Sequence, residues 1–316
     1  MESVQHIKSR LASVKNIGQI TKAMEVVSAT KMRRAQGAAL SSRPFAYGAL
    51  RALADVLKYA PAHLLEASPL VTPREVKTAL LVLIASDRGL AGSFNSQVGR
   101  AVDELFSREA ARGVSAPYRA IVIGKKLVPY VVRKQIPIEQ TFTGFGDYAT
   151  PEEIAPLGDH IVRGYMSGKW DRVVVVSTHF KTTLSQFTVT REILPFHLDQ
   201  VRETVREIVP DHGKYSELRN QMLGETGREG LTDYLFEPSP ELVLAEILPH
   251  LLHMQLLHLV LEANASEHSA RMVAMKNASE NSKELGDDLT LSYNKVRQAG
   301  ITKEMIEIVS AQTAIS

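Results

Sequence analysis

The segment SDRGLAGSFN, Ser86 to Asn95, has the clearest potential for chemistry, and it directly follows the apolar run ALLVLIA. A glycine loop between a strand and a helix presents backbone N–H groups to an anion, which makes this loop a candidate site for a phosphorylated ligand. It lacks the lysine and Ser/Thr of a P-loop and the three-glycine spacing of a dinucleotide fingerprint. The alternative, which we expect, is a tight turn in which Asp87 and Asn95 cap local backbone groups.

Histidines are the other candidates. His250 and His253 have the i, i+3 spacing that can serve a metal ion in a helix, but no acidic residue lies between them as in the H-E-x-x-H motif. We therefore expect ordinary helix histidines and no metal site. Ser177 and His179 share a strand-like segment without an identifiable acid partner, so no catalytic triad is predicted. The chain contains no cysteine, which excludes disulfides, thiolate zinc sites and cysteine nucleophiles.

A central domain, predicted over residues 77–195, must position these residues. Its strand-like segments are KTALLVLIA, YRAIVIG, DRVVVVSTHF and the alternating QFTVTREIL, and helical patterns such as SQVGRAVDELFSREAAR lie between them. Alternation of strands and helices is typical of an α/β domain on a mostly parallel sheet.

Residues 1–60 form a predicted N-terminal helix, interrupted at Pro44. Its apolar residues recur every three or four positions in two runs with a small phase shift: Val4, Ile7, Leu11 and Val14, then Ile17, Ile20, Met24 and Val27. Eight Lys/Arg stand against two Asp/Glu between Met1 and Arg43. Such a basic end predicts either an acidic partner or a solvated helix face.

Residues 240–316 form a second long helix in the prediction, apolar at first and polar from His268 onward, with an intermittent seam that includes Leu285, Leu289 and Val296. Its last nine residues, IVSAQTAIS, carry no charged side chain. A helix of this length must pack one face on another element. We therefore expect a long antiparallel coiled coil of the N- and C-terminal helices beside the central α/β domain.

The segment 196–231 has apolar residues at helical spacing around a PDHG break, which predicts a helical insertion. Its expected buried face comprises Leu198, Val201, Val205 and Leu218. No stretch of the chain reaches the roughly 18 uncharged apolar residues that span a bilayer, and the N-terminus has no apolar signal region. Any membrane association is therefore expected through partners.

Three blocks resemble the gamma subunit of the rotary F-type, proton-translocating ATP synthase. They are IKSRLASVKNIGQITKAMEVVSATKMRRAQ at residues 7–36, SDRGLAGSFN at 86–95, and ASEHSARMVAMKNASENSKELGDDLTLSYNKVRQAGITKEMIEIVSAQ at 265–312. The resemblance covers nearly the whole chain. It implies a central rotor stalk that transmits torque between a membrane ring and a catalytic head, without catalysis or a cofactor of its own.

The resemblance also implies partners and contact residues. The two terminal helices would form a shaft inside the alpha and beta subunits, with the basic helix, Lys31 included, facing acidic loops and the uncharged tip turning in an apolar sleeve. The shaft positions that it implies are Lys22, Met24, Arg297, Gln298, Thr302, Glu304 and Glu307. The insertion at 196–231 would lie at the foot, near the epsilon subunit and the ring of c subunits. No nucleic-acid partner is expected. The implied location is the cytoplasmic face of a bacterial plasma membrane.

One departure from the family pattern concerns the glycine loop. The family usually has cysteine and two glycines after RGL, whereas Ala91, Gly92 and Ser93 stand here. This argues further against chemistry at the loop. The alternative function that remains is an α/β enzyme that binds a phosphorylated ligand at Asp87–Asn95 and uses the long helices to oligomerise.

Overall fold

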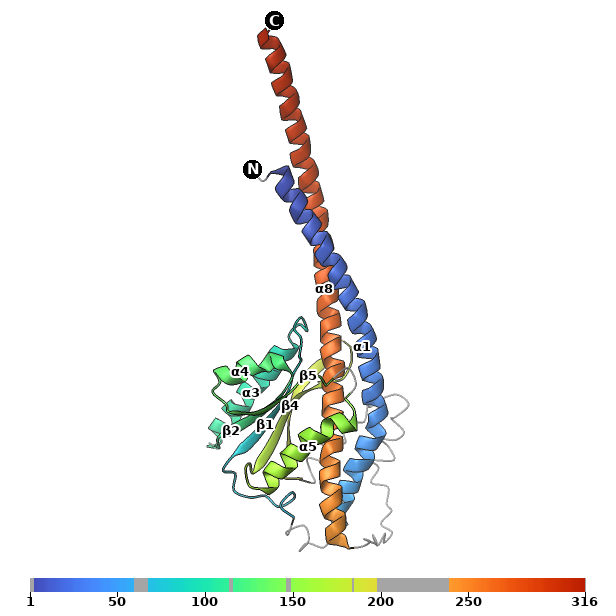
Figure 1. The fold of residues 1–316 in the computed structure, drawn as a ribbon, viewed down its shortest axis with the longest axis vertical. Helices are drawn as coiled ribbons and strands as arrows, with labels where there is room; N and C mark the ends of the chain where they lie inside the picture. Colours follow the sequence, from blue (N-terminus) through green and yellow to red (C-terminus); the bar gives the residue numbers. More distant parts are fainter. Residues whose placement is uncertain are drawn as a thin grey trace. The chain divides into compact units, whose positions relative to one another are not determined.

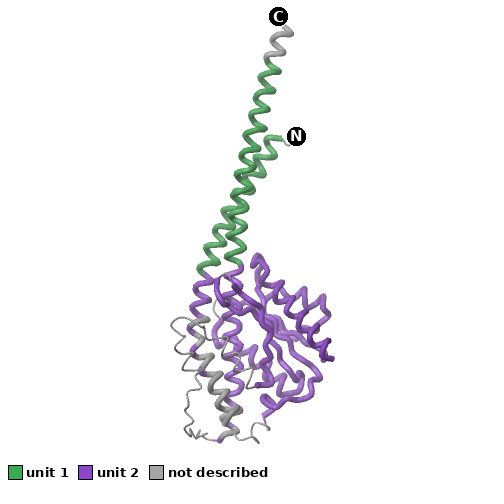
Figure 2. Tube along the Cα trace, turned by 180° about the vertical axis from the view of Figure 1, so that it is seen from behind, with its two compact units in different colours: residues 1–30, 271–316 green, residues 31–270 purple. Residues whose placement is uncertain are grey.

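The computed structural model describes residues 3–59, 68–113, 116–145, 149–183, 185–197 and 239–315. The chain divides into two compact units: unit 1 comprises residues 1–30 and 271–316, and unit 2 comprises residues 31–270 (Figure 2). The helices α1 (Val4–Tyr59) and α8 (Pro240–Ile315), which Figure 1 labels, each contribute one stretch to both units. The predicted interruption of the first helix is wrong, because α1 continues through Pro44.

Unit 2 is built on a five-stranded sheet with the strand order β3-β2-β1-β4-β5. Strand β1 is parallel to β2 and β4, β2 is parallel to β3, and β5 is antiparallel to β4. The mostly parallel sheet predicted from the sequence is therefore confirmed. The strands are β1 (Ala79–Ile84), β2 (Tyr118–Ile123), β3 (Ile138–Phe142), β4 (Arg172–Phe180) and β5 (Gln186–Leu194).

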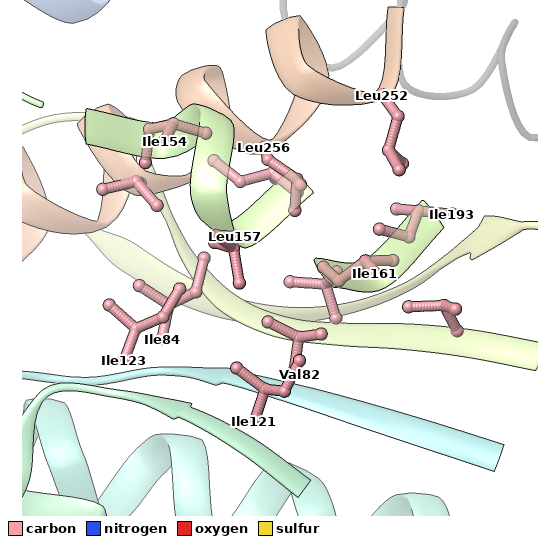
Figure 3. Close-up of a cluster of buried hydrophobic side chains, with 14 of the residues drawn as sticks. Val82, Ile84, Ile121, Ile123, Ile154, Leu157, Ile161, Ile193, Leu252 and Leu256 are labelled. Carbon is pink, nitrogen blue, oxygen red and sulfur yellow. The ribbon is translucent and has the colours of Figure 1, made fainter. Parts of the chain in front are cut away.

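Helices cover both faces of this sheet. On one face lie α3 (Phe94–Ala111), the short 3-10 helix Lys125–Leu127 and α4 (Val128–Arg133), packed on Leu81 and Leu83 of β1. On the other lie α5 (Pro151–Met166) and α8, packed on Val82 and Ile84. Figure 3 shows Ile161 of α5 and Leu256 of α8 above the strands. Burial on both faces explains why β1 is apolar throughout instead of alternating.

Strand β3 and helix α5 are not among the elements predicted from the sequence. Strand β3 is short and carries Glu139 and Gln140, which hide it from a search for apolar runs. Helix α5 contains Pro156 in its interior. Its start is nevertheless well defined, because Thr150 and Glu153 form a reciprocal capping box: the Glu153 N–H donates to the Thr150 hydroxyl and the Thr150 N–H donates to the Glu153 carboxylate.

The unit 1 stretches of α1 and α8 form an antiparallel coiled coil. A Cβ added at Gly18 would lie 3.4 Å from Cβ of Ser282, and one at Gly286 would lie 3.9 Å from Val14. Residue numbers thus rise along α1 as they fall along α8. Among the positions that are buried or half-buried, one series on each helix repeats with alternating steps of three and four. They are Val4, Ile7, Leu11, Val14, Gly18, Thr21, Glu25 and Ser28 on α1, and Met275, Ser279, Ser282, Gly286, Leu289, Tyr293, Val296 and Gly300 on α8.

The second half of the predicted α1 seam is wrong. Ile17, Ile20 and Val27 are 52%, 59% and 53% exposed, and Met24 is half-buried. The buried positions continue at the same spacing of three and four, but they are occupied by small residues, at Gly18, Thr21 and Ser28. The predicted seam position Leu285 is likewise exposed, and its neighbour Gly286 is buried. The side chains of Ile17, Ile20 and Val27 therefore point away from α8.

The register also leaves the end of α8 without a partner from α1. The first turn of α1 lies level with Val296, and every residue from Ile301 to Ile308 is exposed. Four of these side chains are large and apolar: Ile301, Met305, Ile306 and Ile308, which are 49–66% exposed. In unit 1, residues beyond about 297 thus form a single helix with apolar groups on its surface.

Candidate functional site

The glycine loop after β1 uses its polar side chains internally. The carboxylate of Asp87 accepts hydrogen bonds from the Gly144 N–H at 2.8 Å and the Lys125 N–H at 3.2 Å. Asn95 Oδ1 accepts from the N–H of Ser86 at 3.0 Å. These bonds tie together the chain segments that follow β1, β2 and β3. The local capping role expected for Asn95 is confirmed, whereas that expected for Asp87 is wrong, because Asp87 caps neighbouring loops and not its own.

The Gly-Lys pair after β2 has a structural explanation as well. Gly124 has a φ of +87°, and a Cβ there would lie 2.3 Å from the carbonyl oxygen of Ala85. Only glycine combines this backbone conformation with such a close approach. The glycine is therefore required where β1 and β2 end side by side.

The shaft residues implied by the family resemblance form two groups at different positions along the helices of unit 1. Lys31 is the exception, because it is the first residue of unit 2. Lys22 is exposed and forms an ion pair with Glu25 at 3.0 Å; Met24 and Lys31 are half-buried. The second group is exposed near the end of α8 and comprises Arg297, Gln298, Thr302, Glu304 and Glu307. By the coiled-coil register Lys22 and Arg297 are about 30 Å apart along the helices, at 1.5 Å per residue. The structure therefore presents two separate surfaces and not one site.

The four residues assigned to the foot, Leu198, Val201, Val205 and Leu218, lie outside the described residues, as does nearly all of the predicted 196–231 insertion. Phe196, its first residue, is described and buried in the core of unit 2.

A buried polar cluster joins α8 to β4. Nδ1 of His179 lies 2.7 Å from Oε2 of Glu262, and Nε2 of His258 lies 3.2 Å from Oε1 of the same carboxylate. The side chains of Glu262 and His258 are each only 1% exposed. No acid partner for His179 is identifiable in the sequence; in the structure Glu262 is that partner. The i, i+4 spacing of His258 and Glu262 was visible in the sequence, but the 83 positions between His179 and Glu262 hid their contact.

The two imidazoles determine the ionisation of this carboxylate. Burial alone would raise the pKa of Glu262, but His258 and His179 outweigh it and hold the pKa well below its ordinary value of 4.5. A depressed folded-state pKa stabilises the fold at pH values above the unfolded pKa. That contribution is lost as pH falls through the folded-state pKa.

We predict that Glu262→Gln lowers the free energy of unfolding by about 3 kcal/mol at pH 7, because it breaks a buried charge pair. The difference from the wild type should shrink as pH falls below the ordinary glutamate range, since the wild-type carboxyl then takes up a proton. Denaturant unfolding between neutral and acidic pH measures both effects. Glu280→Gln, at an exposed position of α8, is the control. A stability difference that does not change with pH would contradict this explanation.

His250 and His253, the two α8 histidines whose spacing could serve a metal ion, have different surroundings. His250 is exposed, whereas the His253 ring packs over α5, where a Cβ added at Gly158 would lie 1.9 Å from it. Nε2 of His253 is 3.2 Å from Oδ1 of Asp159. In the part of the chain that the structure describes, no three His, Cys, Asp or Glu residues are grouped to hold a metal ion. Nor do these described residues include a helix with a segment long and apolar enough to cross a membrane.

Comparisons with known proteins agree along the whole chain. A family model described as ATP synthase matches residues 3–315. The ATP synthase gamma chain of Roseiflexus castenholzii (strain DSM 13941 / HLO8) is 39% identical over 320 residues, which cover 100% of this chain and 99% of that one. The ATP synthase gamma chain of Crocosphaera subtropica (strain ATCC 51142 / BH68) is 35% identical over 321 residues, covering 100% of both chains.

Solved structures show the same fold. A chain in the cryo-EM structure of Euglena gracilis mitochondrial ATP synthase, OSCP/F1/c-ring in rotational state 3, matches with a TM-score of 0.62 at 19% identity, over 99% of this chain and 94% of that one. A chain of the Tetrahymena thermophila mitochondrial ATP synthase central stalk and c-ring matches with a TM-score of 0.56 at 24% identity, over 82% and 99%.

Proposed function

Because the chain belongs to the gamma-chain family of ATP synthase, we propose that it is the central rotor stalk of an F-type ATP synthase. In this function it transmits torque between the proton-driven ring in the membrane and the catalytic head. It catalyses no reaction itself, and the alpha and beta subunits of the head bind and convert the nucleotide.

The end of α8 is the observation that carries this proposal most directly. A helix in water needs a packed face for stability, and an exposed apolar surface indicates a partner. The four exposed apolar side chains between Ile301 and Ile308 have no partner from α1. A surrounding apolar sleeve in the catalytic head satisfies both requirements, and the uncharged segment that follows fits the same environment.

The outward face of α1 supports the same function. Ile17, Ile20 and Val27 are exposed on one side of α1, and Lys22, which is 63% exposed, lies on the opposite side of the same helix at 3.6 residues per turn. A helix that is exposed on two sides, one apolar and one basic, suits a surrounding head that offers apolar contacts as well as acidic loops. We assign Lys22, Met24 and Lys31 to this contact, and Arg297, Gln298, Thr302, Glu304 and Glu307 to the corresponding contact of α8.

The polar clusters of unit 2 favour a non-catalytic role. Asp87 and Asn95 are engaged with loop backbone, and Glu262 is buried between two histidines. Such groups hold the fold together and are not presented to a substrate. This is why we prefer the rotor function to an enzyme acting at the Asp87–Asn95 loop.

At the other end of the stalk we propose contacts with the epsilon subunit and the ring of c subunits. The segment 196–231, with Leu198, Val201, Val205 and Leu218 as its apolar face, is assigned to this foot on the sequence pattern. The complex is then peripheral to the cytoplasmic face of a bacterial plasma membrane, held there through its partners.

Deleting residues 199–228 and bridging the gap with a short linker should uncouple ATP hydrolysis from proton pumping, because the deletion removes most of the assigned foot. Hydrolysis and pumping are measured in parallel on membrane vesicles. If the complex with the deletion pumps normally for each ATP hydrolysed, the segment is not part of the coupling contact.

The direct test of the proposed function is affinity capture of the tagged chain from a native membrane extract. We expect the alpha, beta, epsilon and c subunits of the ATP synthase to be recovered with it in fixed proportions. Recovery of the chain without them, together with measurable nucleotide binding by the chain alone, would support the enzyme alternative instead.

A further inference from the structure

We propose that three polar side chains on one face of α8, Glu262, Ser266 and Ser269, fix the rotational position of this helix on β4 and β5, so that torque passes between α8 and the α/β domain through them. We call these residues the polar stripe. The proposal rests on the rotor function proposed above, because it assigns the residues through which the rotor carries its load.

The apolar contacts of α8 in unit 2 cannot set this position alone. Between Leu248 and Ala263 most side chains of the helix are buried, and most of the buried ones are leucine. Hydrophobic association is non-directional. When a helix with leucine on most faces turns about its axis, it exchanges one apolar contact for another, so the angle must be determined by directional contacts.

The polar stripe supplies those contacts. Its members are four and three positions apart, which places them on one helix face over about 10 Å. Ser266 Oγ donates to the carbonyl oxygen of Thr178 at 3.4 Å. Ser269 Oγ donates to the carbonyl oxygen of Thr183 at 2.5 Å and accepts from Nε2 of Gln186 at 3.0 Å. The acceptors and donors on the other side belong to β4, β5 and the turn between them.

Glu262 adds a charge to the same face. His258 is on α8 and moves with Glu262, so it stabilises the carboxylate without opposing rotation. His179 is on β4, and its 2.7 Å contact is lost if the helix turns. A buried carboxylate separated from a partner is strongly unfavourable. The pair formed by His179 and Glu262 therefore resists rotation in a way that leucine contacts cannot.

The test uses the complete ATP synthase in sealed vesicles, with Glu262→Gln, Ser266→Ala and Ser269→Ala combined in this chain. We expect ATP hydrolysis without a proton gradient to remain within about twofold of wild type. Protons pumped per ATP against a rising gradient should fall by about fivefold, because directional hydrogen bonds are lost while packing is kept. Lys276→Gln with Glu280→Gln, an exposed pair on the same helix, is the control and should change neither rate.

A second variant separates this role from simple stabilisation. Replacing His179, His258 and Glu262 together by leucine removes every charge of the cluster, and such apolar replacements of buried ion pairs often preserve stability. We expect a chain that melts near the wild-type temperature but pumps poorly against the gradient. If this variant fails to assemble, Ser266→Ala with Ser269→Ala, which removes only small uncharged groups, decides the question.

Polar-stripe variants that pump like the wild type at every gradient would overturn the proposal. Vesicles that contain the complex without this chain provide the independent reference. Normal ATP-driven pumping by those vesicles would refute the rotor function itself, whereas normal pumping by the variants alone would refute only the role of the stripe.

Discussion

Gly164→Ala is expected to lower the free energy of unfolding by about 3 kcal/mol, the upper end of the range for overpacked cores. A Cβ at this position of α5 would lie 2.0 Å from Cζ2 of Trp170. The indole cannot retreat, because it is fully buried and its Nε1 donates to the carbonyl oxygen of Ile161 at 3.1 Å. The melting temperature of the purified chain should fall by at least about 6 °C.

Gly37→Ala is the matched control for this change. Gly37 is also a helical glycine, but a Cβ there would have no atom within 4 Å. Alanine should therefore leave the stability unchanged or raise it by up to about 1 kcal/mol through its higher helix propensity. If the two variants melt at the same temperature, the contact between α5 and Trp170 is not as constrained as the geometry indicates.

Reversing four exposed charges of α1 should strongly reduce coupled ATP synthesis in the assembled complex. The changes are Lys15→Glu, Lys22→Glu, Arg33→Glu and Arg34→Glu, all at exposed positions. Each exposed ion pair with an acidic loop of the head contributes no more than about 1 kcal/mol. Reversal replaces each attraction by repulsion, so four together should reduce synthesis at least about tenfold, and more at low salt. ATP synthesis by energised vesicles is the measurement.

Two further variants serve as controls for this prediction. The charge-conserving set Lys15→Arg, Lys22→Arg, Arg33→Lys and Arg34→Lys should support normal synthesis. The single change Lys31→Ala should be mild, because one partly exposed pair contributes little. Loss of all activity from Lys31→Ala in an assembled complex would count against a diffuse electrostatic contact, and so would normal coupling by the four-fold reversal.

The sequence predicts the elements with strong periodicity and misses those without it. Strands β1 and β4 are continuous apolar runs, and the terminal helices are long, so both are visible in the letters alone. Strand β3 and helix α5 are not, because the charge of Glu139 and the proline at 156 oppose the local pattern. For β3, tertiary contacts override the local pattern, since Arg119 and Lys169 form ion pairs with Glu139. For α5, a local signal other than periodicity, the Thr150–Glu153 capping box, starts the helix.

The coiled-coil seam shows a second limit of periodicity. The predicted seam runs through the large apolar residues Ile17 and Ile20, yet the helices meet at Gly18 and Thr21. Small residues let two backbones approach closely, and a hydrophobicity pattern does not register them. The misplaced residues are informative all the same, because isoleucines excluded from the seam are available to a partner.

The candidate contact residues could be assigned only through the family resemblance. Nothing in the types of Gln298 or Thr302 marks them as contacts, and both are exposed on a helix. The cluster of His179 and Glu262 illustrates the opposite case. Its chemistry is evident once the two residues are seen together, but contacts between distant parts of a chain are not encoded in local spacing.

The antiparallel seam of unit 1 also has a consequence for biosynthesis. The α1 residues Val4 to Ser28 pair with α8 residues near 272–296. A helix synthesised early therefore packs against residues that are synthesised much later. Contacts between such distant positions give this part of the fold a high contact order and slow formation. At the usual rate of about 5–20 residues per second, the α1 seam emerges from the ribosome roughly 15–50 s before its partner is made. During that interval Ile7 and Leu11 have no α8 to cover them, and the nascent chain depends on transient protection from aggregation.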